Sequence, residues 1–278
     1  MDPGFDVVTG AFSFTGQFIA RRLLADGRRV RTLTNHPRRP GAEDLEVQSA
    51  GVRIRGWRLR HAGADPALGT VIYLHGSADN RTSGLFVADR FTRRGYDVVV
   101  YDSRAHGESE GEACTYGYYE KQDLRRVIDS VEPGPVAVIG VSLGGAVALQ
   151  AAAIDARIRT VVAVSTFSDL RTVATERAPG IASKDDIEAA FRLAESTAHF
   201  RVDDVSPVAS AREIAVPVLL VHGEDDRETP AAHSQRVFAA LPGPKRLLLV
   251  PGAGHNDALR ADVWSAIDDW IEKALSSR

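Results

Sequence analysis

Two serines of the chain, Ser142 and Ser109, lie at the centre of the pattern G-x-S-x-G. In this pattern a serine sits on a tight turn between small residues, where its hydroxyl can attack a carbonyl carbon once a base has removed its proton. The two pentapeptides span residues 140–144 and 107–111. So short a motif is weak evidence by itself, and the flanking sequence must separate the two.

The sequence around Ser142 is the one that such a turn requires. An apolar, β-branched run at 135–139 predicts a buried parallel strand, and the alanine-rich run at 145–153 predicts a helix. The resulting order is strand, tight turn and helix, and the flanking glycines leave room for the helix to approach the strand. Ser109 lies between two glutamates with no apolar helix after it. We therefore predict that Ser142 is a nucleophile and that Ser109 is an exposed loop serine.

Two further strands end in residues that complete this chemistry. The apolar run at 216–221 precedes Asp226, and the run at 246–250 precedes His255. Because parallel strands end at the same edge of a sheet, these side chains are expected to meet Ser142. An imidazole there removes the serine proton, and a buried carboxylate orients the imidazole and stabilises its cation. His255 is the predicted base and Asp226 the predicted acid, with Asp225 as the alternative acid.

The chain order Ser142, Asp226, His255 resembles that of the α/β-hydrolase superfamily, closest to its serine esterase and peptidase-like branch. Residues 74–77 (LHGS) and 101–109 (YDSRAHGES), each after a predicted strand, extend the resemblance, which covers residues 43–278. It implies an oxyanion hole formed by the backbone N–H groups of Ser77 and Leu143. It also implies structural roles for His75 and His106.

The remaining pattern predicts the α/β fold class. Apolar runs and helical patterns alternate along the chain, which is typical of a mostly parallel sheet with helices on both faces. The predicted strands lie near 70–75, 97–101, 135–140, 160–165, 216–221 and 245–250, and the predicted helices near 83–94, 118–131, 144–154, 234–241 and 257–275. Segments 44–48 and 52–55 alternate like antiparallel strands, with a bulge expected at Gly56, where the alternation shifts.

One connection is too long for an ordinary crossover. About fifty residues separate the strands near 160–165 and 216–221, which predicts an inserted helical cap at about 166–212 within a hydrolase domain of residues 41–278. A helix is expected after Ser183, which has a capping-box-like pattern. Its apolar face of Ile187, Phe191 and Ala194 either lines an acyl pocket or packs within the cap.

Residues 1–40 form a separate, βαβ-like extension in this prediction. Residues 5–40 resemble the first βαβ segment of an atypical short-chain dehydrogenase of the NAD(P)-binding Rossmann type, with residues 9–16 (TGAFSFTG) in the place of the glycine fingerprint. Ser13 stands where the middle glycine is expected, and the hydrolase pattern replaces the other strands. We therefore expect this segment to bind no dinucleotide and the protein to need no cofactor.

Composition limits the function further. The chain is 44% hydrophobic and 26% charged with a net charge of −3, which gives no general attraction to nucleic acid. It has no apolar run long enough to span a membrane and no basic start of a signal peptide, so a cytoplasmic location is expected. Cys114 is the only cysteine, which excludes an intrachain disulfide and a zinc site built from thiolates. Oligomeric state is not indicated.

These observations predict a serine hydrolase, of carboxylesterase type, that cleaves small to medium carboxylic esters through an acyl-enzyme on Ser142. A peptidase or amidase acting on short peptides is the alternative, because the same three residues serve both reactions. Two hypotheses of another class stay open. One is an NAD(P)-binding redox or sensor protein, and the other is a non-catalytic binding protein with the hydrolase fold.

Overall fold

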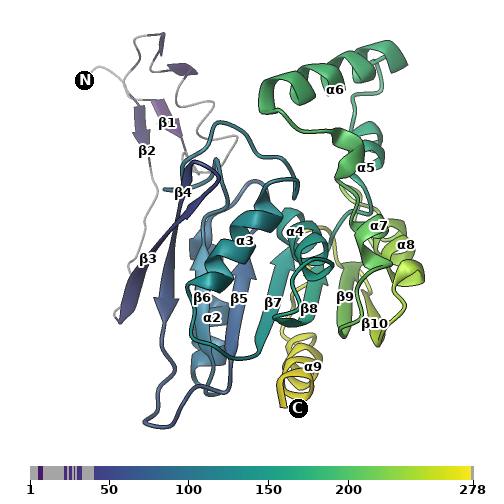
Figure 1. Ribbon diagram of the computed structural model, residues 1–278. Helices are drawn as coiled ribbons and strands as arrows, with labels where there is room; N and C mark the ends of the chain where they lie inside the picture. The colour runs from purple at the N-terminus through teal and green to yellow at the C-terminus, as the bar shows by residue number, and fades with distance from the viewer. Residues whose placement is uncertain are drawn as a thin grey trace.

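The structure, a computed structural model, describes residues 6–8, 22, 23, 25, 26, 28, 30–32 and 41–276 of the 278-residue chain. Its centre is an eight-stranded sheet in the order β10-β9-β8-β7-β5-β6-β4-β3 (Figure 1). All neighbours from β6 to β10 pair in parallel, whereas β4 is antiparallel to both β6 and β3. The strands are β3 (Ala42–Ser49), β4 (Val52–Leu59), β5 (Thr70–Leu74), β6 (Asp97–Tyr101), β7 (Val136–Val141), β8 (Ile158–Val164), β9 (Val218–Gly223) and β10 (Lys245–Val250).

Helices cover both faces of this sheet, as the sequence predicts. One buried core lies between the sheet and α3, α4, α7 and α8, and a second lies between the sheet and α2 and α9. The helices and short 3₁₀ turns are η1 (Arg81–Gly84), α2 (Leu85–Thr92), α3 (Glu120–Asp129), α4 (Leu143–Ala152), α5 (Leu170–Glu176), α6 (Lys184–Ala198), η2 (Val202–Asp204), α7 (Pro207–Ala211), α8 (Ala232–Ala240) and α9 (Trp264–Ser276). No helix in this described part of the chain is both long and apolar enough to cross a membrane.

The segment between β8 and β9 carries α5, α6, η2 and α7. Figure 1 shows α6 (green) at the top of the view, above the ends of the strands. Ser183 caps α6 with the reciprocal hydrogen bonds of a capping box, its partner being Asp186. Phe191 is buried and Ile187 packs beside it in a third apolar cluster, which includes Phe167 and Phe200. This face of α6 therefore packs in an apolar cluster that the segment shares with Ala146 of α4 and with Tyr118, which is nearer to the second of the two alternatives that the sequence left open. Ala194 is exposed.

The bulge predicted at Gly56 is wrong. Pairing between β3 and β4 runs without a shift from Ser49–Val52 to Ala42–Leu59. The apolar phase changes because β4 moves from one core to the other: Ile54 belongs to the core under α3 and α4, whereas Trp57 belongs to the core under α2 and α9. Gly56 lies opposite Tyr101 of β6, and a Cβ there would be 2.6 Å from Val100 O. Close strand contact explains this glycine.

The last helix begins later than the apolar stripe predicts. Leu259 and Val263 precede α9, which starts at Trp264, because the chain makes successive turns after β10. Those turns carry His255. Farther towards the N-terminus, β1 (Asp6–Val8) and β2 (Val30–Thr32) pair in parallel as a separate two-stranded sheet. The fingerprint predicted at 9–16 lies outside the described residues.

A strained turn joins β7 to α4. Ser142 has φ 51° and ψ −110°, a conformation that L-residues seldom adopt outside functional turns. A Cβ on Gly140 would lie 2.2 Å from Gly144 O, and one on Gly144 would lie 2.3 Å from Leu74 O. Only glycine fits at both positions, because the strand β7 and the helix α4 are in close contact there. Ser142 lies on the turn between them.

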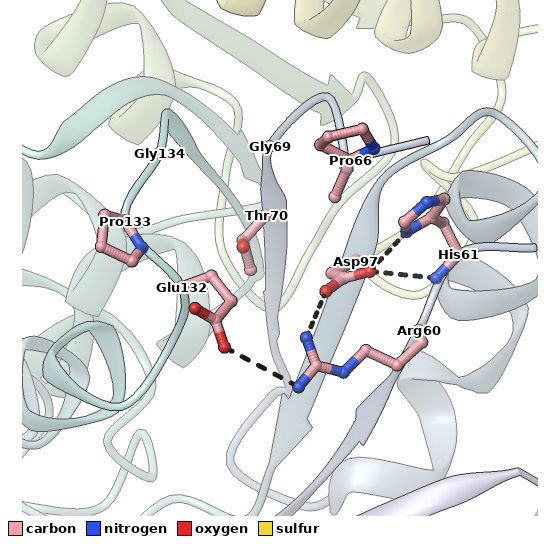
Figure 2. Close-up of a pocket in the computed structure, with 10 residues that line it drawn as sticks. Arg60, His61, Pro66, Gly69, Thr70, Asp97, Glu132, Pro133 and Gly134 are labelled. Atoms are coloured by element: carbon pink, nitrogen blue, oxygen red, sulfur yellow. Dashed lines mark hydrogen bonds and ion pairs between the residues drawn. The ribbon is translucent and has the colours of Figure 1, made fainter. Parts of the chain in front are cut away.

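The amino ends of the strands carry a cluster of charged side chains. Figure 2 shows His61 and Arg60 converging on Asp97 at the amino end of β6. His61 donates Nδ1–H to Asp97 Oδ1 over 2.9 Å and Nε2–H to Asp65 O over 2.8 Å. Hydrogen bonding of the imidazolium to Asp97, then to Asp65 O, raises the pKa of His61 from its ordinary value of 6.5. The hydrogen bonds of His61 therefore hold the loop between β4 and β5 against Asp97 of β6.

The first prediction concerns the turn. Gly140→Ala places a methyl group against backbone that cannot move, so it should lower the free energy of unfolding by more than about 2 kcal/mol or prevent folding. Gly134→Ala is the control, because a Cβ at Gly134 meets nothing within 4 Å. Urea denaturation followed by circular dichroism measures both. Equal stability of the two variants would show that the turn tolerates a side chain.

The second prediction concerns His61. Because its folded-state pKa is raised, the ion pair with Asp97 stabilises the fold fully below the unfolded pKa of 6.5 and is lost as pH rises through the folded pKa. His61→Gln should therefore lower Tm more at about pH 5.5 than at about pH 9. In an Asp97→Asn background this pH dependence should disappear. A Tm difference that is constant with pH would contradict the assignment.

Candidate active site

The carboxyl ends of β7, β9 and β10 bring three predicted residues into one line. Ser142 Oγ lies 3.0 Å from His255 Nε2, and His255 Nδ1 lies 2.7 Å from Asp226 Oδ2. The carboxylate accepts from Nδ1–H, which leaves Nε2 as the acceptor for the serine hydroxyl in the neutral ring. Asp225 is exposed and its side chain is not part of this line. The geometry is that of a nucleophile, a base and an orienting acid.

Asp226 is buried and surrounded by donors. Its Oδ1 accepts from the backbone N–H groups of Thr229, at 2.8 Å, and Glu228, at 3.0 Å. Its Oδ2 accepts from His255 and, at 3.2 Å, from His222. Burial alone would raise the pKa of Asp226, but the hydrogen bonds from His222, His255 and Thr229 outweigh burial and hold the pKa well below its usual range. The carboxylate is therefore ionised at neutral pH.

His222 is a partner of Asp226 that the sequence analysis did not identify. This fully buried histidine donates Nε2–H to Thr229 O over 2.7 Å as well as to Asp226, and its Nδ1 lies 2.7 Å from Ser234 Oγ. The spacing of four between His222 and Asp226 was the available signal, but in a strand followed by a turn that spacing does not predict contact. Asp226 is thus held by groups from β9 and from the loop after it.

The loop of His255 is fixed from a neighbouring strand. Ser165 follows β8 with φ 49°, and its hydroxyl donates to His255 O over 3.0 Å. Its backbone N–H donates to Val221 O of β9 over 2.8 Å. His255 is therefore positioned both through its ring and through its main chain.

Ser77 and Leu143, the two predicted oxyanion-hole residues, both lie near Ser142. Ser77 lines the same pocket as Ser142 and His255. Leu143 is the first residue of α4, where a backbone N–H has no partner within its own helix. A Cβ on Gly76 would be 3.7 Å from Ser142 Cβ, so the loop after β5 passes close to the serine.

Two buried imidazoles hold that loop. His75 accepts from Ser103 N–H at Nε2 over 3.0 Å and donates Nδ1–H to Gly76 O over 2.7 Å. Burial and the neighbouring His106 lower the pKa of His75 to about 4, so this ring is neutral. His106 Nε2 lies 2.8 Å from Ser77 O. Both rings bond to the backbone and lie outside the line of Ser142, His255 and Asp226.

Ser109 is buried, and the expectation of an exposed loop serine is wrong. Its hydroxyl donates to Asp102 O over 2.6 Å and accepts from Arg55 N–H over 2.8 Å. These partners come from β4 and from the end of β6, which the local sequence could not reveal. Asp102 behaves as a strand-end residue, since its carboxylate accepts from Arg81 and from the N–H of Glu108. Ser109 is therefore a structural residue.

The pocket at Ser142 has a volume of about 310 Å³, and its walls are partly polar and partly apolar. Arg177, Glu228, Asp79 and Asn256 contribute to it, and the sequence analysis identified none of them. Another pocket, of about 390 Å³, lies at the amino ends of the strands, around the cluster of His61 and Asp97 (Figure 2). Among the residues that the structure describes, no group of three or more His, Cys, Asp or Glu side chains is placed to hold a metal ion.

Comparisons with known sequences and with solved structures agree on the family of this chain. A sequence model of the alpha/beta hydrolase family matches residues 71–266. The protein YfhR of Escherichia coli K12 is 30% identical over 84% of this chain and 82% of its own length, and the quorum-quenching protein AidA of Acinetobacter baumannii is 28% identical over 56% of each.

Solved structures agree on the fold. The esterase Pf2001 of Pyrococcus furiosus superimposes with a TM-score of 0.68 at 22% identity, covering 84% of this chain and 93% of that one. An acylaminoacyl peptidase of Pyrococcus horikoshii superimposes with a TM-score of 0.67 at 15% identity, covering 84% and 41%. With its strand order and a family match over most of its length, this chain belongs to the alpha/beta hydrolase family.

Proposed function

We propose that the protein is a serine hydrolase that cleaves small to medium carboxylic esters through an acyl-enzyme on Ser142. The observation that carries this proposal is the unbroken hydrogen-bonded line from the ionised Asp226 through His255 to Ser142 Oγ, beside a pocket of about 310 Å³. The strained backbone of Ser142 supports it, because such strain is maintained mainly where it presents a reacting group.

The mechanism follows from these positions. His255 Nε2 accepts the hydroxyl proton as Ser142 Oγ bonds to the ester carbonyl carbon. When the tetrahedral intermediate collapses, the bond from carbon to the alcohol oxygen breaks and His255 returns the proton to the leaving alcohol. A water molecule then loses a proton to His255 and attacks the acyl carbon. The acid departs, and the proton returns to Ser142 Oγ.

Two other parts of the site have roles in this proposal. Asp226 holds the imidazole in the tautomer with a proton on Nδ1 and stabilises the imidazolium. The N–H groups of Ser77 and Leu143 stabilise the oxyanion, a type of contact whose loss commonly costs about 3 kcal/mol in the transition state. The same arrangement can attack an amide, so p-nitrophenyl butyrate and an aminoacyl p-nitroanilide should be compared. We expect faster turnover of the ester.

Ser142→Ala tests the nucleophile. Loss of the hydroxyl should abolish covalent labelling by a fluorophosphonate and lower ester turnover to near background, with little change in Tm, because only one partly accessible oxygen is removed. Ser109→Ala is the matched variant from the second pentapeptide. It should lower Tm, since two buried hydrogen bonds are lost, and keep the labelling. Labelling that survives in Ser142→Ala would refute the assignment.

Asp226→Asn tests the acid. The amide cannot stabilise the imidazolium and favours the wrong tautomer, so kcat should fall by about 10⁴-fold. Asp225→Asn removes the neighbouring exposed carboxylate and should change kcat by less than about threefold. Steady-state kinetics with p-nitrophenyl butyrate measure both variants. A large loss in Asp225→Asn with a small loss in Asp226→Asn would transfer the role to Asp225.

A further inference from the structure

Arg177 is the one lysine or arginine among the described residues that line the pocket of Ser142 and His255. It follows the last residue of α5, so the segment between β8 and β9 delivers it to the site. Its side chain is exposed. This guanidinium takes part in none of the steps of the proposed ester hydrolysis.

Neutral oxygens hold the guanidinium in place. Arg177 Nε donates to Glu228 O over 2.8 Å, and Nη2 donates to Thr229 Oγ1 over 2.5 Å. Thr229 is fully buried, and its backbone N–H donates to Asp226. The orientation of Arg177 is therefore fixed by the same loop that surrounds the acid, and the side chain needs no large rearrangement before it binds a ligand.

The positive charge of Arg177 has no counter-ion within the described residues, since none of their carboxylate oxygens lies within 4.0 Å of its nitrogens. Arg171, near the start of α5, differs: it pairs with Glu188 at 2.6 Å and with Asp203 at 2.5 Å. A planar guanidinium with neutral partners retains its charge for an anion, and a carboxylate matches its geometry.

Two carboxylates limit where such an anion can lie. Asp79 and Glu228 line the same pocket, and Asp79 Oδ1 accepts only a backbone bond, from Asn80 N–H at 2.8 Å. An anion beside either side chain would be repelled, so the binding position is restricted to the neighbourhood of Arg177. The pocket volume of about 310 Å³ is at the lower end for ligand sites, which favours a short substrate.

We propose that the substrates are small esters that carry a carboxylate within a few bonds of the scissile carbonyl, and that Arg177 binds this carboxylate. This inference rests on the proposed esterase function and adds the substrate class. Arg177 is then a specificity-determining residue. Its removal should affect anionic esters far more than neutral esters of the same shape.

The test compares two pairs of isosteres by titrating the acid released. Monomethyl succinate and methyl 4-methylpentanoate differ by a carboxylate on the acyl side. The butyrate ester of glycolic acid and isobutyl butyrate differ by one on the alcohol side. The readout for each pair is the ratio of kcat/KM for the anionic ester to that for the neutral ester. A purely structural role of Arg177 changes both members of a pair equally and leaves the ratio constant.

We expect Arg177→Gln to lower at least one ratio by about tenfold, because a charge-assisted contact is lost. Arg192→Gln, an exposed arginine of α6 that does not line the pocket, is the matched control and should leave both ratios unchanged. Glu228→Gln should raise the ratio that Arg177→Gln lowers, since a like charge is removed.

The proposal is overturned if Arg177→Gln changes both ratios by less than about fivefold, or if Arg192→Gln lowers them as much. Either result, with p-nitrophenyl butyrate still hydrolysed in a Ser142-dependent way, refutes the substrate class and leaves the esterase function intact. If the wild-type protein hydrolyses none of these esters and does not react with a fluorophosphonate, the proposed function itself has failed.

Discussion

The buried carboxylate of Asp226 is the group on which the site depends. An ionised carboxylate inside a protein is very unfavourable unless it is paired and hydrogen-bonded. Here the donors are two imidazoles and two backbone N–H groups, from His222 on β9, from the loop after it, and from His255 after β10. These donors meet only when adjacent parallel strands end together, so the orientation of His255 is a product of the whole fold.

The same edge of the sheet supplies the other components. β7 ends in a turn so crowded that Gly140 and Gly144 admit no side chain, and the turn presents Ser142 to His255. β5 ends in the loop of Ser77, which is held by two buried histidines. The amino ends of the strands also have a large pocket, but its charged side chains pair with one another and stabilise a loop.

Sequence reasoning located the strands well, because strands buried on both faces are continuous apolar runs with little ambiguity. Ser142, Asp226 and His255 each come within five residues after such a run, and the structure brings these three predicted residues together, while their catalytic roles stay a prediction. Sequence reasoning placed the start of α9 too early, because an apolar stripe does not show where successive turns end and a helix begins.

Most of the remaining errors come from contacts between segments that are distant in the sequence. Ser109 is polar and flanked by glutamates, and its burial depends on partners on β4 and just after β6. The apolar alternation shifts at Gly56 because the first part of β4 packs into one core and the second part into the other. The sequence of one strand does not show which core each side chain enters. His222 and Arg177 were not predicted as site residues, because their contacts with Asp226 and Thr229 depend on the conformation of the loop at residues 226–229.

The central claim is that an acyl group is transferred to Ser142, and rapid-quench mass spectrometry tests it most directly. The protein is mixed with p-nitrophenyl butyrate, quenched in acid within the first turnover and digested. We predict a burst of p-nitrophenol approaching one equivalent and a butyryl group on the peptide that contains Ser142. Hydrolysis without a burst and without an adduct, or an adduct on another residue, would contradict the account.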